Sequence, residues 1–263
     1  MTNRVWLDQP GLASAAGPVP APPAAHARPL QIGGITPFTS IDFPGRLAAV
    51  VFVQGCPWRC TWCHNPHLQP RRADDASGGR PWAEVRGWLA RRTGLIDGVV
   101  FSGGEPTIDP GLAATMADVR AMGFAVGLHT AGIYPRRLQD VLPLADWVGF
   151  DVKAPLSRPA LLDRTTGVAG STGAVQQSLR LLRASGVAFE CRTTAHPALL
   201  DEAALQLIGD ELAALGITHV ALQRARPVAA AAAPLDPVPK DWPSAATLEH
   251  FERLFPHFVL RDG

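Results

Sequence analysis

The sequence predicts an α/β fold with one parallel sheet, because short apolar runs alternate with longer segments of helical period. Strands separated by helices are the sequence form of successive βαβ units, whose crossovers are right-handed. Six such units fit a partial barrel or a doubly wound sheet. A chain of 263 residues has about the length at which α/β barrels form single units. We therefore expect a partial (β/α)6 TIM-type barrel with parallel strands.

The predicted elements follow one another in strict alternation. The first strand, LAAVVFVQ, is a short run rich in branched and other apolar residues. The strands are predicted at 47–54, 98–102, 125–128, 147–152, 188–193 and 218–222. The helices are predicted at 82–92, 111–122, 135–142, 173–185 and 201–215. One last helix and strand are expected after residue 244.

Two tracts rich in Ala and Pro interrupt this organisation. Residues 1–28 have no apolar period, so we expect a disordered tail there and a single catalytic domain over 29–263. The second tract, ARPVAAAAAPLDPVPKDWPS at 225–244, is predicted to be a long irregular connection.

Composition excludes several classes of function. The formal net charge is +1, and no basic run is interleaved with aromatic residues, so we expect no nucleic-acid partner. Four cysteines are too few for a secreted disulfide scaffold. The first residues lack a signal-peptide pattern, and no window of about 18 apolar residues suggests a membrane span. We expect a cytoplasmic protein in a reducing setting.

Polar and glycine residues collect at the carboxyl ends of the predicted strands, the edge that carries the site in parallel α/β folds. In chain order these residues are Cys56, Ser102-Gly103-Gly104-Glu105-Pro106, His129-Thr130-Ala131-Gly132, Asp151 and Lys153, Arg192 and Thr194, and Gln223. This convergence predicts one functional site at one rim of the sheet.

Three of the four cysteines follow the first strand with the spacing Cys56-x3-Cys60-x2-Cys63. A disulfide would pair two of them and leave one over, and the expected setting is reducing. A structural zinc site could use His64, although adjacent Cys63 and His64 do not easily reach one ion. An iron–sulfur cluster normally takes four thiolates, and Cys191 is more typical of a buried strand residue than of a fourth ligand. Three thiolates would leave one iron open for chemistry.

These motifs carry a family resemblance. The Cx3Cx2C loop with Trp62 before its last cysteine resembles the signature of the radical S-adenosylmethionine (SAM) enzymes, and FSGGEP at 101–106 resembles the GGE motif of that superfamily. The stretch IGGITPFTSIDFPGRLAAVVFVQGCPWRCTWCHNP at 32–66 is similar to activating enzymes of glycyl-radical proteins, above all those of anaerobic ribonucleoside-triphosphate reductase. The resemblance covers about residues 30–225, and its GGEP, DVK and RTT motifs stand in the family's order.

The resemblance implies a [4Fe–4S] cluster and S-adenosyl-L-methionine as cofactors, and a reductive cleavage that gives a 5′-deoxyadenosyl radical. It also implies a glycyl-radical enzyme as partner and reduced flavodoxin or ferredoxin as electron donor. The metal ligands and catalytic residues would be Cys56, Cys60 and Cys63. The residues expected to contact the cofactor are Trp62, His64, Gly103, Gly104, Glu105, Thr130, Asp151, Lys153 and Arg192.

Each of these motifs also has a purely structural explanation. GGEP is also typical of a strand-to-helix turn, Asp151 and Lys153 of a strand-end salt bridge, and Arg192 of an ion pair with Glu190. The segment His129-Thr130-Ala131-Gly132 departs from the DTNG of related activating enzymes, so part of the polar network must differ. His196 is either a ribose contact or a satisfied loop histidine.

Two other functions compete with an activating enzyme. One is a small-molecule radical SAM enzyme such as a 7-carboxy-7-deazaguanine synthase, and the other is a zinc-binding module without catalysis. Activating enzymes with extra cluster domains carry further cysteines soon after the first motif, whereas the only cysteine left here is Cys191, so we expect one cluster.

Overall fold

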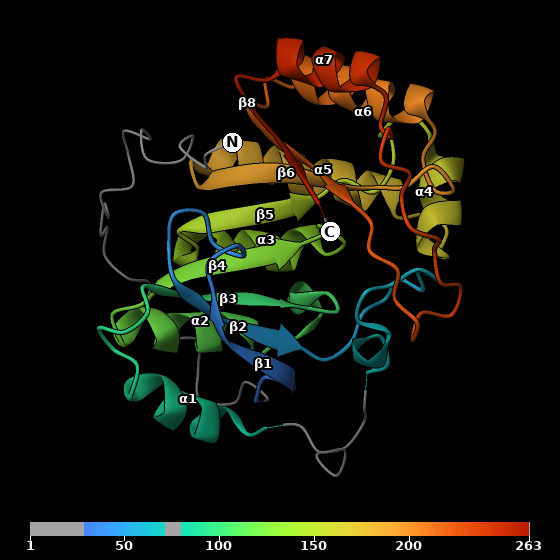
Figure 1. The fold of residues 1–263 in the computed structure, drawn as a ribbon. Helices are drawn as coiled ribbons and strands as arrows, with labels where there is room; N and C mark the ends of the chain where they lie inside the picture. Colours follow the sequence, from blue (N-terminus) through green and yellow to red (C-terminus); the bar gives the residue numbers. More distant parts are fainter. Residues whose placement is uncertain (1–28, 72–79, 263) are drawn as a thin grey trace.

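The computed structural model describes residues 29–71 and 80–262, in which eight strands form one sheet with the spatial order β1 to β8. The strands are β1 (Ile32–Thr39), β2 (Ala48–Val53), β3 (Gly98–Gly103), β4 (Ala125–Thr130), β5 (Trp147–Asp151), β6 (Ala188–Ala195), β7 (His219–Arg224) and β8 (His257–Arg261). β1 pairs with β2 in the antiparallel sense, and all later neighbours are parallel. β1 and β8 are the two edges, so the barrel is open between them (Figure 1).

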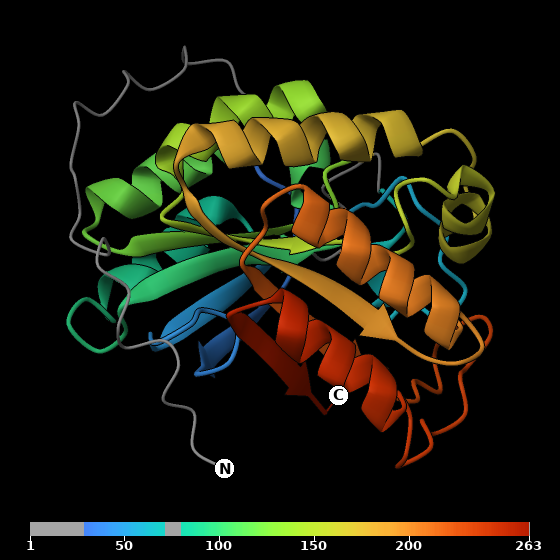
Figure 2. The same ribbon diagram turned by 90° about the horizontal axis from the view of Figure 1, so that it is seen from above.

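The helices follow the strands as the alternation predicts. They are α1 (Trp82–Ala90), α2 (Leu112–Ala121), α3 (Pro135–Val141), α4 (Pro159–Thr166), α5 (Thr172–Ser185), α6 (Glu202–Ala214) and α7 (Ala245–Leu254). In the described ranges, short 3-10 turns occur at η1 (Pro66–Leu68), η3 (Pro106–Ile108) and η4 (Leu142–Leu144). Seen from above, the helices surround the outside of the curved sheet (Figure 2). None of the helices in the described ranges is long and apolar enough to cross a membrane.

The predicted α/β fold with a mostly parallel sheet is confirmed, with two additions, β1 and α4. β1 was not predicted, because IGGITPFT has no apolar alternation. The last helix and strand expected after residue 244 are α7 and β8, and β8 pairs with β7 in the parallel sense. α4 was also missed, although Pro159 in its first turn and left-handed Gly167 (φ 70°) after its last are the usual boundary signals. The tail expected at 1–28 lies outside the described residues. Residues 225–244 contain no helix or strand.

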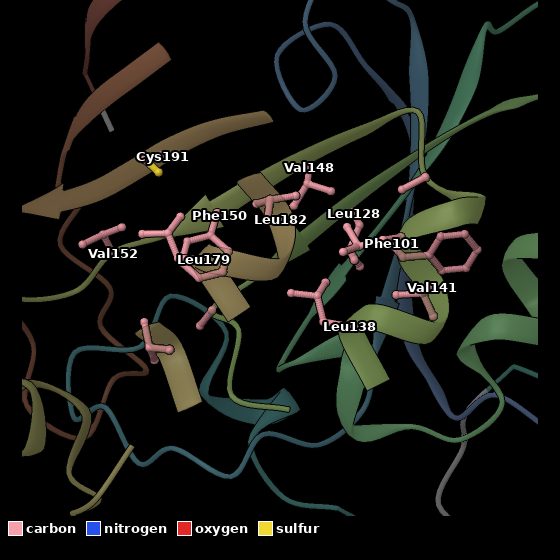
Figure 3. Close-up of a cluster of buried hydrophobic side chains, with 14 of the residues drawn as sticks. Phe101, Leu128, Leu138, Val141, Val148, Phe150, Val152, Leu179, Leu182 and Cys191 are labelled. Carbon is pink, nitrogen blue, oxygen red and sulfur yellow. The ribbon is translucent and has the colours of Figure 1, made fainter. Parts of the chain in front are cut away.

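The main core lies between the sheet and its helices. Alternate side chains of the strands point outward, and Figure 3 shows Phe101, Leu128, Val148 and Phe150 packed against helices α3 and α5. The inner face is apolar only near its base, where a second cluster joins Phe43, Ala48, Val50, Val100 and Trp147. The rest of the inner face is therefore free to carry polar side chains.

Candidate active site

One cavity of about 350 Å³ opens at the carboxyl ends of the strands, and all predicted site residues line it. They come from the loop after β2, from β3 and β4 with their following loops, and from β5 and β6. Its wall comprises Cys56, Trp58, Cys60, Trp62, Cys63, His64, Gly103, Gly104, Glu105, His129, Thr130, Asp151, Lys153, Arg192, Thr194, Gln223, Arg224, Arg226 and Arg261, together with Ile41, Asp42, Pro44 and further residues. The structure thus brings the predicted residues together, while their roles stay predictions.

The cysteine loop, residues 55–71, closes on itself by backbone hydrogen bonds. Gly55 N–H donates to Leu68 C=O (2.8 Å) and Cys56 N–H to Gln69 C=O (3.0 Å). The Gln69 side chain returns to donate to the carbonyl of Cys60 (3.0 Å), and Gly55 takes a positive φ of 105° that favours glycine. The loop is therefore a closed structure and not an open excursion from the strand.

Helix α4 and the residues after it hold the other side of this loop. The indole N–H of Trp62 donates to Thr165 C=O (2.9 Å), and that of Trp58 donates to the Ser171 hydroxyl (2.9 Å). The backbone N–H of Arg59 donates to Thr166 C=O (2.8 Å). Both tryptophans are buried, so they support the loop by packing as well as by hydrogen bonds.

Gly103 and Gly104 allow β3 to approach the cysteine loop. A Cβ on Gly104 would lie 2.2 Å from the carbonyl oxygen of Gly55, and one on Gly103 would lie 2.4 Å from the backbone N and O of Val53. Gly103 also has a φ of 126°, which strains any other residue. The close approach that requires these glycines is therefore to the chain itself.

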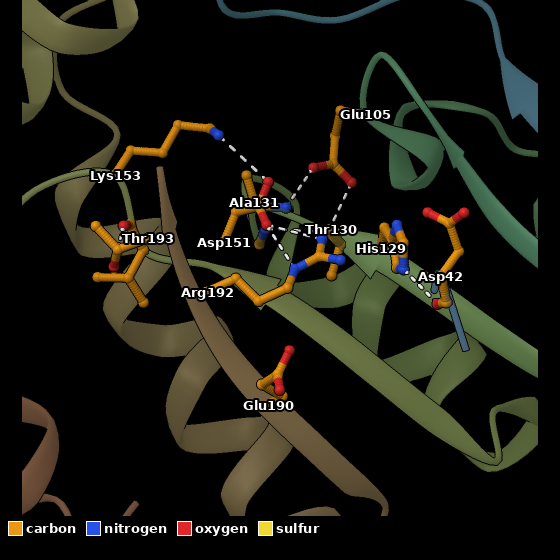
Figure 4. Close-up of polar contacts among 12 residues, drawn as sticks. Asp42, Glu105, His129, Thr130, Ala131, Asp151, Lys153, Glu190, Arg192 and Thr193 are labelled. Carbon is orange, nitrogen blue, oxygen red and sulfur yellow. Dashed lines mark hydrogen bonds and ion pairs between the residues drawn. The ribbon is translucent and has the colours of Figure 1, made fainter. Parts of the chain in front are cut away.

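The carboxylate of Glu105 joins the third strand to the fourth. Its Oε1 accepts hydrogen bonds from the hydroxyl groups of Thr107 (2.6 Å) and Thr130 (2.7 Å) and from the Thr107 N–H (3.1 Å). Its Oε2 accepts one bond, from the Ala131 N–H (2.8 Å), and so retains acceptor capacity (Figure 4). Burial raises the pKa of Glu105, although these donors oppose that effect. The Thr130 hydroxyl is committed to Glu105 and not to the open cavity.

Asp151 is shared by two cations. Its Oδ1 accepts from Nε (3.1 Å) and Nη2 (2.8 Å) of Arg192, and its Oδ2 lies 3.2 Å from Lys153 Nζ (Figure 4). Burial alone would raise the pKa of Asp151, but Lys153 and Arg192 outweigh it and lower that pKa. Arg192 therefore pairs with Asp151, whereas Glu190, the partner considered from the sequence, pairs with Arg261 (2.7 Å). Two cations on one carboxylate leave a positive charge in excess.

His129, near the end of β4, stands where the related DTNG motif has an acid. Its Nε2 lies 2.9 Å from the carbonyl oxygen of Asp42, which can only accept, so Nε2 carries the proton. Burial, with the charge of Arg192, lowers the pKa of His129 to about 3. The neutral ring thus ties the loop before β2 to the cavity wall (Figure 4).

The four cysteines occupy two places in the fold. All four are free thiols, and Cys191 lies on the outer face of β6 in the main core (Figure 3). Among the described residues, no three His, Cys, Asp or Glu side chains converge as ligands of one metal ion do. Thiolates are soft ligands that suit both zinc and iron–sulfur clusters. Burial raises the pKa of Cys56 to about 12 and that of Cys60 to about 11, so a bound metal must displace their protons.

Several cavity residues were missed from the sequence. Ile41, Asp42 and Pro44 belong to the loop between β1 and β2, which lies across the inner face because Phe43 packs on Trp147 (ring centroids 5.9 Å apart). Arg224, Arg226 and Arg261 come from β7, its following segment and β8. Only the IDFPG motif signalled the first group, and nothing in the local sequence marked the arginines. His196 is a satisfied loop histidine, bonded to Asp236 C=O and the Ala198 N–H.

Comparison with known proteins gives a family match over most of the fold. The model of the Radical SAM superfamily matches residues 50–208. A putative glycyl-radical enzyme activating enzyme of Methanocaldococcus jannaschii is 27% identical over 176 residues, which are 65% of this chain and 70% of that protein. The pyruvate formate-lyase-activating enzyme of Clostridium pasteurianum is 31% identical over 130 residues, 47% of this chain and 52% of that protein.

Two further similarities concern the competing function and the fold. The 7-carboxy-7-deazaguanine synthase of Geobacter sulfurreducens is 27% identical over 138 residues, 45% of this chain and 55% of that protein. This chain therefore spans only about half the length of two of the three relatives. The crystal structure of QueE from Escherichia coli superposes with a TM-score of 0.58 at 19% identity, covering 88% of this chain and 93% of that one. At this identity the superposition shows a common fold.

Proposed function

Because the chain belongs to the radical SAM superfamily, we propose that it is an activating enzyme that generates a glycyl radical on a partner protein. The observation that carries the proposal is the convergence of three free thiols with Gly104, Glu105 and the Asp151 network in one cavity. The names of two of the relatives, which describe activating enzymes, support it.

Cys56, Cys60 and Cys63 would ligate three irons of a [4Fe–4S] cluster and leave the fourth iron for S-adenosyl-L-methionine. When bound, the two groups together supply the reducing electron and the 5′-deoxyadenosyl radical. The positive charge of Lys153 opposes the burial that raises the pKa of the Cys60 thiol, so it favours the thiolate that ligation needs.

The remaining residues of the cavity would bind and orient S-adenosyl-L-methionine. The carbonyls of Gly103 and Gly104 and the free capacity of Glu105 Oε2 suit the ammonium of the cofactor. The positive excess on Lys153 and Arg192 suits its carboxylate. Trp62 and His64 would border the adenine, and buried Trp58 helps to exclude water from the loop.

For the partner we propose an anaerobic ribonucleoside-triphosphate reductase, with reduced flavodoxin or ferredoxin as electron donor. The support is the IDFPG segment, which resembles that group of activating enzymes. Ile41, Asp42 and Pro44 of this segment line the cavity, where a glycine-bearing segment of a partner would have to enter.

Two assays test the proposal. Reconstituted protein with dithionite and S-adenosyl-L-methionine should form 5′-deoxyadenosine, and Cys60→Ala should form none, because it lacks one ligand. Cys191→Ala is the matched control and should keep the activity, since that thiol lies in the outer core. With the reductase added, electron spin resonance should show a glycyl doublet. Cleavage without a doublet on any glycyl-radical protein would reject the activating function and keep the superfamily chemistry.

A second candidate is a 7-carboxy-7-deazaguanine synthase, supported by the similarity to the Geobacter protein. Incubation with a pterin precursor and detection of 7-carboxy-7-deazaguanine by mass spectrometry distinguishes the two functions. This product, without a glycyl doublet, would favour the second candidate.

A further inference from the structure

The irregular segment 225–244 between β7 and α7 is anchored at both ends and in its middle. At its start, Ala225 N–H donates to Ala195 C=O (3.0 Å). In the middle, Nε2 of His196 lies 3.0 Å from Asp236 C=O, and because His196 Nδ1 accepts from the Ala198 N–H, Nε2 is the donor. At its end, Ser244 N–H donates to Glu202 (2.8 Å). Such a segment has a fixed path although it forms no regular structure.

This path brings the segment onto the cysteine loop. Ala233 N–H donates to the carbonyl of Thr61 at 2.8 Å, and Thr61 lies in the turn between Cys60 and Cys63. Arg226 of the same segment lines the cavity together with His64. A connection that only joined β7 to α7 would not need either contact.

With the contact at Thr61, the Cys60–Cys63 turn is held from one side by segment 225–244 and from the other by the end of α4. Arg59 and Trp62, the residues on either side of Cys60 and Thr61, are bonded to the carbonyls of Thr166 and Thr165 at the end of α4. Within the turn, Cys63 N–H reaches Cys60 C=O at 3.2 Å, which is a long hydrogen bond. The turn is thus held mainly by contacts from outside it: from the end of α4, from the Gln69 side chain on the Cys60 carbonyl (3.0 Å), and from Ala233.

We propose that segment 225–244 is a positioning element for the cysteine loop, and that the Ala233 N–H to Thr61 C=O bond holds the Cys60–Cys63 turn in its ligating conformation. The inference rests on the proposed function for its purpose, since the turn would present two of the three thiolates to the cluster. The proposed catalytic roles do not explain the Ala- and Pro-rich segment 225–244, and this inference gives it a role.

The test uses proline and glycine variants of one alanine. Ala233→Pro removes the N–H that bonds to Thr61. In the metal-free protein it should increase amide hydrogen exchange in the Cys60–Cys63 turn about fivefold, which corresponds to the stability contributed by one hydrogen bond. Ala233→Gly keeps the N–H and should exchange like the unmodified chain. Ala229→Pro is the matched control, because it lies second in the turn closed by Ala231 N–H and Val228 C=O, where proline is favoured.

Reconstituted protein gives the second readout. Ala233→Pro should release iron to a chelator faster and alter the cluster's spin resonance signal, with the midpoint of thermal unfolding close to that of Ala229→Pro. If Ala233→Pro folds poorly, His196→Leu removes the middle anchor instead and should raise exchange in the same turn. Equal exchange in Ala233→Pro, Ala233→Gly and Ala229→Pro overturns the positioning role. Since exchange is measured without metal, that result is independent of whether 5′-deoxyadenosine forms.

Discussion

The two faces of the sheet differ in how they are stabilised. The outer face is filled by apolar side chains such as Phe101, Leu128 and Phe150, each fully buried against helices. The inner face, above the cluster around Trp147, carries charged groups that are held in pairs, among them Glu190 with Arg261. Removing buried volume lowers the stability of apolar packing, whereas removing one partner lowers the stability of a buried ion pair. The outer face is therefore stabilised by apolar packing, and the inner face, which carries the candidate site, by the pairing of charges.

The largest expected effect is on the outer face. Phe150→Ala should lower the free energy of unfolding by about 3 to 5 kcal/mol, because it leaves a cavity in a fully buried cluster. Thr194→Ala, on the inner face of β6, should change it by less than about 0.5 kcal/mol. Urea unfolding of both variants measures the difference. Similar losses in the two would mean that the inner face contributes packing of the same kind.

The next effect breaks an inner-face pair. Glu190 is fully buried and receives two hydrogen bonds from Arg261, at 2.7 and 2.8 Å. Arg261→Met should cost about 3 kcal/mol of unfolding free energy, since it leaves a buried carboxylate without its cation. The double variant Glu190→Gln with Arg261→Met should recover most of that loss. If the double variant does not recover stability, the loss in Arg261→Met comes from the missing packing of the arginine side chain and not from the unpaired charge of Glu190.

The faces should also differ in their response to pH. Burial lowers the pKa of His129 to about 3 and that of His219 to about 4, so both inner-face rings are neutral in the folded protein. The unfolded chain takes up these protons near pH 6.5, so stability is fully present above that pH and decreases as the pH falls toward 4. His129→Gln should flatten this dependence between pH 7 and 5, measured by urea unfolding. Phe150→Ala should keep the slope of the unmodified chain, and a steeper slope in His129→Gln would contradict the assignment.

The outer face and the site were predictable from the sequence to different degrees. Apolar runs such as LAAVVFVQ predicted the parallel strands, and the cysteine, GGE and DVK motifs predicted which residues meet at the rim. These signals are local, and the parallel topology converts them into a shared site. β1 was not predicted because its glycines and proline conceal a strand that pairing with β2 alone specifies.

Pairing between distant strands was beyond the sequence for the same reason. Glu190 and Arg192 stand two apart on β6 and face the same side, which made them candidates for each other. In the structure Arg192 turns to Asp151 on β5, while Glu190 meets Arg261, 71 positions later. Only the order of the strands determines that choice. The contact between Ala233 and Thr61 is likewise a product of the path that the chain takes after β7.

The smallest effect is expected for an exposed ion pair, which can be compared with the buried pair of Glu190 and Arg261. Arg80 and Glu84 lie 3.5 Å apart, with side chains 61% and 60% exposed, as a pair four residues apart at the start of α1. Water and salt screen both charges, so Glu84→Gln should change the free energy of unfolding by no more than about 0.5 kcal/mol, and less at high salt. Arg261→Met should keep its larger cost in the same salt, because Glu190 is shielded from solvent. Unfolding at low and high salt measures both, and a loss for Glu84→Gln as large as that for Arg261→Met would remove burial as the reason for the contrast.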